Sequence, residues 1–343
     1  MDASETRPQD FKNRKTGLVI FGGMEILIGC LCLLFCGLIL AVNLVGRGSA
    51  VSAPALPSNA SMVMSLGFYG GFAIFFVWMG LGSMKGRRWA RALMLITSIC
   101  WLIVGTLTTF FLAFVIPQMI SAALVGSGAT MTGKAAAGAT VAAMAMVVSF
   151  IALFMAILPG IFFLFYRSSH VKATCEHMDP KERWTDRVPL AVLALSVLLA
   201  LGGTYLFLML AAPAFPLFGF PLRGPLAILA MLVMAVAMWV LAVNVYRRQR
   251  WAWTAALVFT LLGYLSTFIT FLRMDAAQLM ETAGVRSTPG NAQAFAAMVP
   301  AMNVMVAVSM VIWLAYLLYV LRYFKGATGA PASESPGRDG EGP

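Results

Sequence analysis

The residues that could do chemistry lie in two regions of the sequence. Glu25 lies inside a long apolar segment, where an ionised carboxylate is unfavourable and by default marks a functional group. His170, Cys175 and His177 form the pattern H-x4-C-x-H, and imidazole and thiolate groups are preferred ligands of zinc. The first region therefore indicates an intramembrane carboxyl site and the second a metal site, and each also has an ordinary structural interpretation.

Two interpretations of Glu25 stay open. In one, the carboxyl group carries protons or pairs with a cation in a cavity. In the other, it lies about 10 Å from the start of its helix, near enough to the membrane surface to meet Arg14, Lys15 or a neighbouring basic turn. We favour the second interpretation because the interface is so close.

The histidine–cysteine pattern is a weak metal signal. Glu176 or Asp179 could supply a fourth ligand, but structural zinc sites use other spacings, and this segment has a single cysteine. Catalysis by Cys175 with His177 as base lacks a third group to orient the base. We therefore expect ordinary surface residues here, with no cofactor and no enzymatic activity.

Two connecting segments have local patterns of their own. Asp179-Pro180-Lys181-Glu182 is typical of a helix start, with Asp as the N-cap and Pro at the first position. It predicts a short surface helix that ends before Pro189. Residues 212–225 are rich in proline and phenylalanine, and we expect them to be non-helical and to lie at the membrane interface.

The elements that hold these residues are long apolar segments. Of the 343 residues, 61% are hydrophobic and 11% are charged, whereas soluble domains have about 25% charged residues. A helix crosses a bilayer with about 20 apolar residues, and only helices or closed barrels satisfy their backbone in lipid. The sequence predicts an all-α membrane protein with eight transmembrane helices. They are Leu18–Val45, Ser65–Met84, Ala92–Ile116, Val141–Tyr166, Val188–Ala212, Pro225–Tyr246, Trp253–Leu272 and Ala301–Leu321.

The distribution of cations predicts the orientation of the chain. Most Lys and Arg residues fall in alternate connecting segments, together with both ends of the chain. Positive residues favour the cytoplasmic side, so both termini are expected in the cytoplasm, with the protein in the cytoplasmic (inner) membrane. The first apolar segment is longer than the roughly 7–15 residues of a signal-peptide core, and we interpret it as a retained helix.

Two short basic turns contain tryptophan, in the sequences KGRRWARAL and YRRQRWAWTAAL. Such turns anchor topology, with the cations near anionic head groups and the indole at the interface. They are too short to bind nucleic acid. The candidate lipid head-group contacts are Arg87, Arg88, Trp89, Arg91, Arg248, Arg250 and Trp251.

The two turns also indicate an internal repeat. Arg88-Trp89-Ala90 recurs as Arg250-Trp251-Ala252, and aligning the first and fifth apolar segments places Gly37 on Gly203 and Ala191 opposite Glu25. An even number of helices in each half predicts two parallel four-helix repeats. The expected divisions are a tail at 1–17, a membrane unit at 18–166, a connector at 167–187, a second unit at 188–323 and a disordered tail at 324–343.

At the connector and the RRWAR turn, the chain resembles a group of uncharacterised bacterial multi-pass membrane proteins. The resemblance implies a bacterial cytoplasmic membrane and carries over no catalytic residue.

These observations favour a non-enzymatic membrane component or scaffold. Its expected partners are the lipid bilayer and other membrane proteins or further copies of itself. The alternative is a transporter or permease for a small solute or lipid that uses Glu25. A membrane enzyme acting on lipids is a third class, but the chain has only two histidines and no paired intramembrane carboxylates.

Overall fold

Eight long helices dominate the computed structural model, which describes residues 12–48, 59–126, 142, 145–211, 214–282 and 289–325. Within these ranges, eight helices are long and apolar enough to cross a membrane, and each overlaps one predicted segment. The structure therefore agrees with a multi-pass membrane protein. The candidate spans are Lys15–Leu44, Met62–Met84, Arg88–Ala113, Ala145–Arg167, Leu190–Met209, Gly224–Tyr246, Arg250–Arg273 and Phe295–Phe324.

The first half of the chain contains the spans up to Arg167 and the connector that follows. Its elements are α1 (Lys15–Gly48), α2 (Asn59–Met84), α3 (Arg88–Gly126), the π-helical η1 (Leu153–Ile157), α5 (Leu158–Arg167), α6 (Ser169–Met178) and the 3-10 turn η2 (Trp184–Asp186). Because α3 begins before the predicted Ala92, Trp89 and Arg91 belong to a helix and not to the turn.

The second half contains four spans and a small cap. Its elements are α7 (Leu190–Met209), β1 (Ala214–Leu217), β2 (Phe220–Arg223), α8 (Gly224–Tyr246), α9 (Arg250–Arg273), α10 (Ala276–Thr282) and α11 (Pro289–Lys325). The predicted start of the last helix at Ala301 is wrong, because α11 continues through Pro300. A membrane helix tolerates an internal proline where other groups satisfy the freed backbone.

The predicted connector helix is misplaced. The helix α6 ends at Met178, so Asp179 follows a helix instead of starting one, and Trp184–Asp186 forms only a 3-10 turn. The Asp179 carboxylate accepts hydrogen bonds from the Arg183 side chain, which draws the following residues into a loop.

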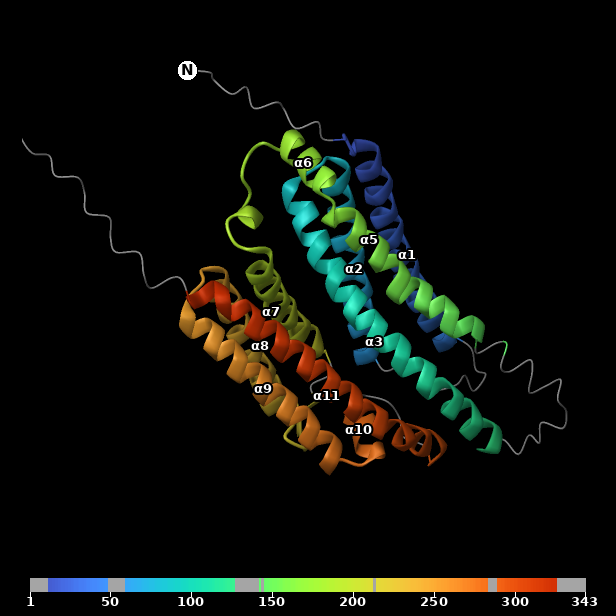
Figure 1. Cartoon of the computed structure of the whole chain (residues 1–343). Helices are drawn as coiled ribbons and strands as arrows, with labels where there is room; N and C mark the ends of the chain where they lie inside the picture. The colour runs from blue at the N-terminus through green and yellow to red at the C-terminus, as the bar shows by residue number, and fades with distance from the viewer. Residues whose placement is uncertain are drawn as a thin grey trace, which may run out of the picture.

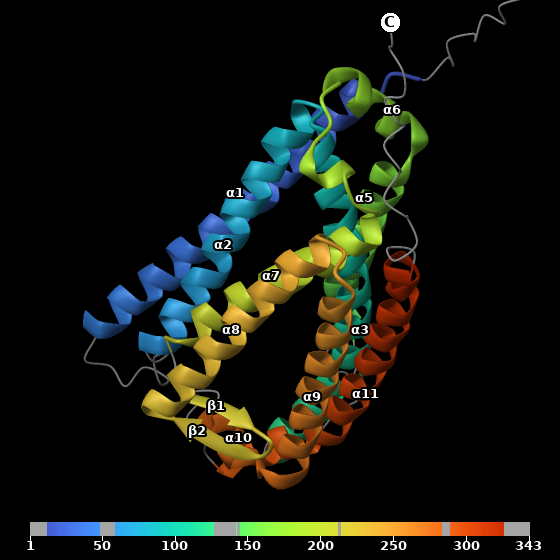
Figure 2. The ribbon, with the colours of Figure 1, turned by 90° about the vertical axis from the view of Figure 1, so that its left-hand side faces the viewer.

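Both halves are built from two helix pairs. Neighbouring helices α1 and α2 pack along each other, as do α7 and α8 (Figure 1). The helix α3 packs against α5, and α9 against α11. Contact between α3 and α11 joins the halves, while α6 lies at one end of the bundle and the hairpin of β1 and β2 at the other (Figure 2).

Small residues set the register within the pairs α1–α2 and α7–α8, as is usual between membrane helices. A Cβ added at Gly22 would lie 2.7 Å from the Gly80 carbonyl oxygen, and one at Gly29 would lie 3.0 Å from that of Ala73. In the second pair, a Cβ added at Gly203 would lie 2.9 Å from the Ala235 carbonyl oxygen.

These contacts bear on how the two halves would be aligned. Gly29 meets the Ala73 carbonyl group and Gly203 meets the Ala235 carbonyl group. Under the repeat proposed below, with the helix ends Met84 and Tyr246 matched, these contacts would align Gly203 with Gly29 instead of Gly37. Apolar helices look alike at several registers, and only the packed pair distinguishes them.

A two-residue turn, Phe218-Gly219, joins β1 to β2. Both residues have positive φ, 50° and 81°, as a tight antiparallel hairpin requires. Their backbone N–H groups donate to the buried hydroxyls of Ser266 and Thr270 in α9, at 2.9 and 3.1 Å. The expectation of a non-helical segment is confirmed for residues 214–223, whereas α8 already begins at Gly224 and residues 212 and 213 lie outside the described part. The hairpin itself was not predicted, and its position at the membrane interface stays a prediction.

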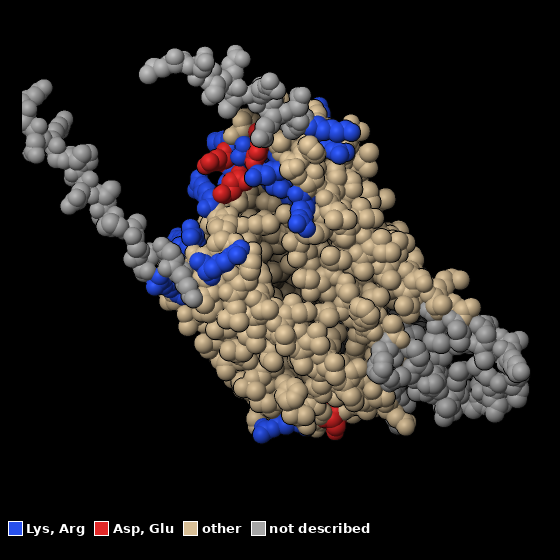
Figure 3. Space-filling model, in the orientation of Figure 1, with Lys and Arg blue, Asp and Glu red and all other residues tan. Residues whose placement is uncertain are grey.

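Charged side chains concentrate at one end of the bundle, which we call the basic end (Figure 3). There α1, α3, α7 and α9 begin, α2, α5, α8 and α11 end, and the connector lies across the surface. The sides between the two ends are almost entirely uncharged in this view. An apolar band between polar ends is the surface that a bilayer requires.

Candidate functional site

Glu25 lies in a closed cluster of three polar side chains, here called the polar cluster. The Tyr166 hydroxyl donates to Glu25 Oε1 at 2.5 Å, and Ser83 Oγ donates to Glu25 Oε2 at 3.0 Å. The two hydroxyl oxygens lie 2.9 Å apart. Each member comes from a different helix, so the cluster ties α1, α2 and α5 together.

The cluster is fully enclosed by apolar side chains. Glu25 and Tyr166 are both 0% exposed, and Ser83 is 1% exposed. Phe21, one turn before Glu25, stacks on Phe165 with ring centroids 3.9 Å apart and covers the same end of α5. A buried polar group is tolerated only when it is hydrogen-bonded, and here each of the three groups has partners.

The cluster lies close to the basic end of the bundle. Ser83 is the residue before the end of α2, and Tyr166 is the residue before the end of α5. Glu25 therefore lies on the side of its span that is nearer the basic end, level with the ends of α2 and α5.

The expected contact of Glu25 with a cation is not observed among the described residues. Among the described residues, the ion pairs do not include Glu25, and its contacts are hydroxyl groups instead of Arg14 or Lys15. Arg14 instead lies against the connector, where its backbone N–H donates to Thr174 Oγ1 at 3.1 Å.

A second group of charges, the connector clasp, consists of Arg87, Arg88, Asp179, Arg183 and Asp186. Arg183 donates two hydrogen bonds to the Asp179 carboxylate, at 2.8 and 3.0 Å, and Arg87 lies 3.5 Å from it. Arg88 lies 3.9 Å from Asp186. The clasp holds the connector against the turn between α2 and α3.

Electrostatics favour the charged form of Asp179. The hydrogen bond from Arg183 lowers the pKa of this carboxyl group despite the opposing effect of burial, and Asp179 in turn raises the pKa of Arg183. The side chain of Asp179 is 3% exposed, so its charge is compensated almost entirely by the arginines.

The residues of the first turn that were predicted to contact lipid head groups have partners within the protein. Arg87 and Arg88 face the carboxylates of the clasp, and Arg91 lies half-buried one turn into α3. The Trp89 ring stacks on Trp78 of α2, with centroids 4.3 Å apart. These side chains bind the connector and α2, and whether they also contact lipid stays a prediction.

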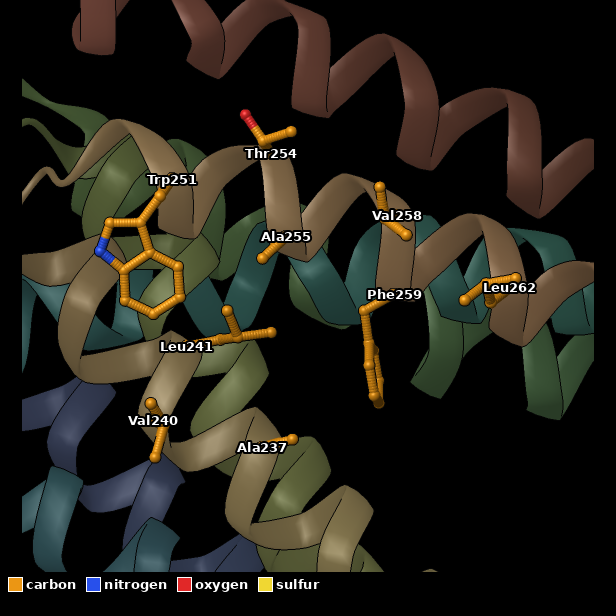
Figure 4. A pocket seen from close by; sticks show the side chains of 9 residues that line it. All are labelled: Ala237, Val240, Leu241, Trp251, Thr254, Ala255, Val258, Phe259 and Leu262. Atoms are coloured by element: carbon orange, nitrogen blue, oxygen red, sulfur yellow. The ribbon is translucent and has the colours of Figure 1, made fainter.

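The second turn uses its cations differently. Arg248 donates to the Tyr323 carbonyl oxygen at 2.9 Å, and Arg250 donates to that of Phe324 at 3.0 Å. Both are at the C-terminal end of α11, where carbonyl groups lack helical partners and cations are favourable. Trp251 is 52% exposed and points between α8 and α9 (Figure 4).

The three weak metal candidates lie on α6, but they do not form a site. Cys175 is buried, whereas His177 is exposed and lines a hollow with Asn13 and Lys15. Burial raises the pKa of the Cys175 thiol to about 11, and a metal binds the thiolate. In the part of the chain that the structure describes, no three His, Cys, Asp or Glu side chains gather as metal ligands.

Sequence reasoning missed Ser83, Tyr166 and the clasp role of Asp179. Ser83 and Tyr166 lie near helix ends, where isolated polar side chains are common in membrane proteins and carry no particular signal. Their position relative to Glu25 depends on how α2 and α5 pack on α1.

Comparison with known proteins gave no relationship that could assign this site. No model of a protein family, no curated protein and no solved structure matches the chain.

Proposed function

We propose that this protein is a non-enzymatic component of a bacterial cytoplasmic membrane that acts by binding other membrane proteins or lipids. The observation that carries the proposal is the enclosure of Glu25. The single spanning-helix carboxylate is sealed at the edge of the bundle by Tyr166 and Ser83. A carboxyl group in this position fastens three helices.

A role in transport would require Glu25 to be accessible to a solute or to protons. A transporter generally binds its solute near the middle of the membrane, at broken helices or exposed polar groups. The π-helical turn Leu153–Ile157 and Pro159 leave the fourth span continuous. The carbonyl of Met155 in that turn packs against Gly105 of α3, because a Cβ there would lie only 1.7 Å from the oxygen.

The matched turns support the proposal of two parallel repeats. Gly86 and Arg248 both have positive φ, 61° and 58°. Their N–H groups donate to Ser83 O and Val245 O, both at 2.9 Å. The next residue of each turn repeats the same pattern, with Arg87 N–H bound to Gly82 O at 3.0 Å and Gln249 N–H to Asn244 O at 3.1 Å.

The test separates a component from a transporter. The protein, purified in mild detergent, is expected to retain a partner membrane protein at fixed stoichiometry, and deleting the gene is expected to lower the amount of that partner in the membrane. Wild-type protein and Glu25→Gln should both restore it, because neutral hydrogen bonding still links the three helices. A solitary chain whose proteoliposomes pass protons, with a flux abolished by Glu25→Gln, would replace this proposal with transport.

Thiol labelling tests the proposed orientation, in a chain whose native cysteines have been replaced. Phe220→Cys in the exposed hairpin should react with an impermeant maleimide added to intact cells. Lys181→Cys in the exposed part of the connector should react only after permeabilisation. The reverse pattern would place both termini outside.

A further inference from the structure

An apolar groove lies between α8 and α9, on the side of the bundle (Figure 4). Its volume is about 730 Å³, and its lining is entirely uncharged. Ala237 and Val240 of α8 form one wall, and Val258 and Leu262 of α9 form part of the other. Trp251 lies at the end of the row nearest the turn between the two helices.

The first half shows why this groove exists. Counted back from the matched ends of α2 and α8, Phe75 corresponds to Ala237 and Trp78 corresponds to Val240. Trp78 fills the space in the first half by stacking on Trp89. In the second half both residues are smaller, so Trp251, which corresponds to Trp89, has no such ring to stack on.

The groove has the dimensions of an acyl chain in one leaflet. From Trp251 to Leu262, α9 rises about 16 Å, which is close to half of the roughly 30 Å hydrocarbon core. The groove starts beside Trp251, near the first residue of α9 at the basic end, and runs along α9 to Leu262, away from that end.

The turn at the mouth of the groove is positively charged. The turn there contains Arg247, Arg248 and Arg250, and Arg247 is exposed. In the first half, the connector supplies carboxylates to the turn. The sequence contains no acidic residue between Asp186 and Asp275, so α7, α8, α9 and their turns add cations alone at this end.

We propose that the groove between α8 and α9 binds an anionic glycerophospholipid. One acyl chain lies along Val240 and Val258 and takes the place that the Trp78 ring holds in the first half. The phosphate lies at the exposed Arg247, and the positive charges of Arg248 and Arg250 in the same turn add to the attraction. Arginine pairs well with phosphate because its N–H groups donate in a planar fork. This site specifies the lipid-binding part of the function proposed above, and its loss would leave the binding of partner proteins open to its own test.

The test introduces, at positions of α8, the larger side chains found at the corresponding positions of α2. Val240→Trp and, separately, Ala237→Phe should fill the groove, and Val243→Trp is the matched control. Val243 lies on the same helix and is similarly exposed, 51% against 47% for Val240, but it does not line the groove. Each protein is titrated in detergent with phosphatidylglycerol or with phosphatidylcholine of the same chains, and bound lipid is counted by native mass spectrometry.

The wild-type protein and Val243→Trp should bind one phosphatidylglycerol about tenfold more tightly than phosphatidylcholine, since each nearby arginine adds about 1 kcal/mol of attraction. Both groove-filling variants should lose this site while their helical content and unfolding temperature stay near wild-type values. Arg247→Gln should reduce the preference for phosphatidylglycerol and leave some binding of either lipid, because the acyl chain still enters the groove.

Three results would overturn the proposal. Equal binding of the two lipids by the wild-type protein would remove the role of the arginines. Undiminished phosphatidylglycerol binding in both Val240→Trp and Ala237→Phe would place the lipid elsewhere. A dimer that the same two variants abolish, without any change in lipid binding, would assign the groove to a second copy of the chain.

Discussion

The basic ends of the two halves differ in the side chains that fill them. Under the proposed repeat, counted from Gly29 and Gly203, Glu25 would correspond to Leu199, and Ser83 to Val245 at the ends of α2 and α8. Leu199 and Val245 lie in an apolar cluster with Val320 and Phe324 of α11. The basic end of the second half is therefore held together by apolar packing, whereas that of the first half also contains a hydrogen-bonded carboxyl group.

The basic turns and the neighbouring sides of the bundle also differ between the two halves. In the first half, the clasp acids neutralise the turn and Trp78 closes the side of the bundle. In the second half, the arginines of the turn bind the end of α11 and the side stays open as a groove. We infer that the first half is sealed by its own side chains and that the second half is available to a ligand.

The largest effect is expected from breaking the polar cluster. Tyr166→Phe removes the hydroxyl that donates to Glu25 and should lower the free energy of unfolding by about 3 kcal/mol, because a buried carboxyl group loses a partner. Unfolding in detergent, followed by circular dichroism, measures this effect.

A triple variant replaces the polar cluster with apolar side chains like those in the second half. Glu25→Leu, Ser83→Val and Tyr166→Phe together should recover most of the stability lost in Tyr166→Phe alone, since no polar group is left unsatisfied. The comparison of the two halves fails if the triple variant is less stable than the single one.

An intermediate effect is expected from the clasp. Asp179→Asn removes a charge that Arg87 and Arg183 surround and should lower the free energy of unfolding by about 1–2 kcal/mol at pH 7. Lys172→Ala is the control, because its pair with Glu176 is exposed on both sides and should contribute less than about 0.5 kcal/mol.

The pH dependence of the same pair of proteins sharpens this prediction. The pKa of Asp179 is lower in the folded protein than in the unfolded chain, so its stabilising effect is complete above an unfolded pKa of about 3.9. The effect is lost as the pH falls through the folded pKa. Wild-type protein and Asp179→Asn should therefore converge in stability below about pH 4, and a constant difference would show that the charge is not responsible.

The smallest effect is expected at the matched turns. Gly86→Ala places a side chain at a φ of 61° and against Met178, and it should lower the free energy of unfolding by about 1 kcal/mol. Gly71→Ala, which meets nothing within 4 Å, should be neutral or slightly stabilising because alanine favours helix. Equal losses in the two variants would mean that the turn geometry has no particular role.

The eight helices, and the place of Glu25 within the first of them, follow from the sequence. Length and hydropathy suffice for this, because each helix satisfies its own backbone and faces lipid. The sequence also identified both tryptophan turns, since a basic turn is a local pattern.

Which side chains meet depends on the packing of the helices. The partners Ser83 and Tyr166, the close contact of Gly29 with Ala73, and the groove beside Val240 all arise between separate helices. Apolar helices look alike at many registers, and the pattern of hydropathy does not distinguish them. Contacts between individual atoms of small residues and hydroxyl groups select one register, and those contacts exist only once the helices are side by side.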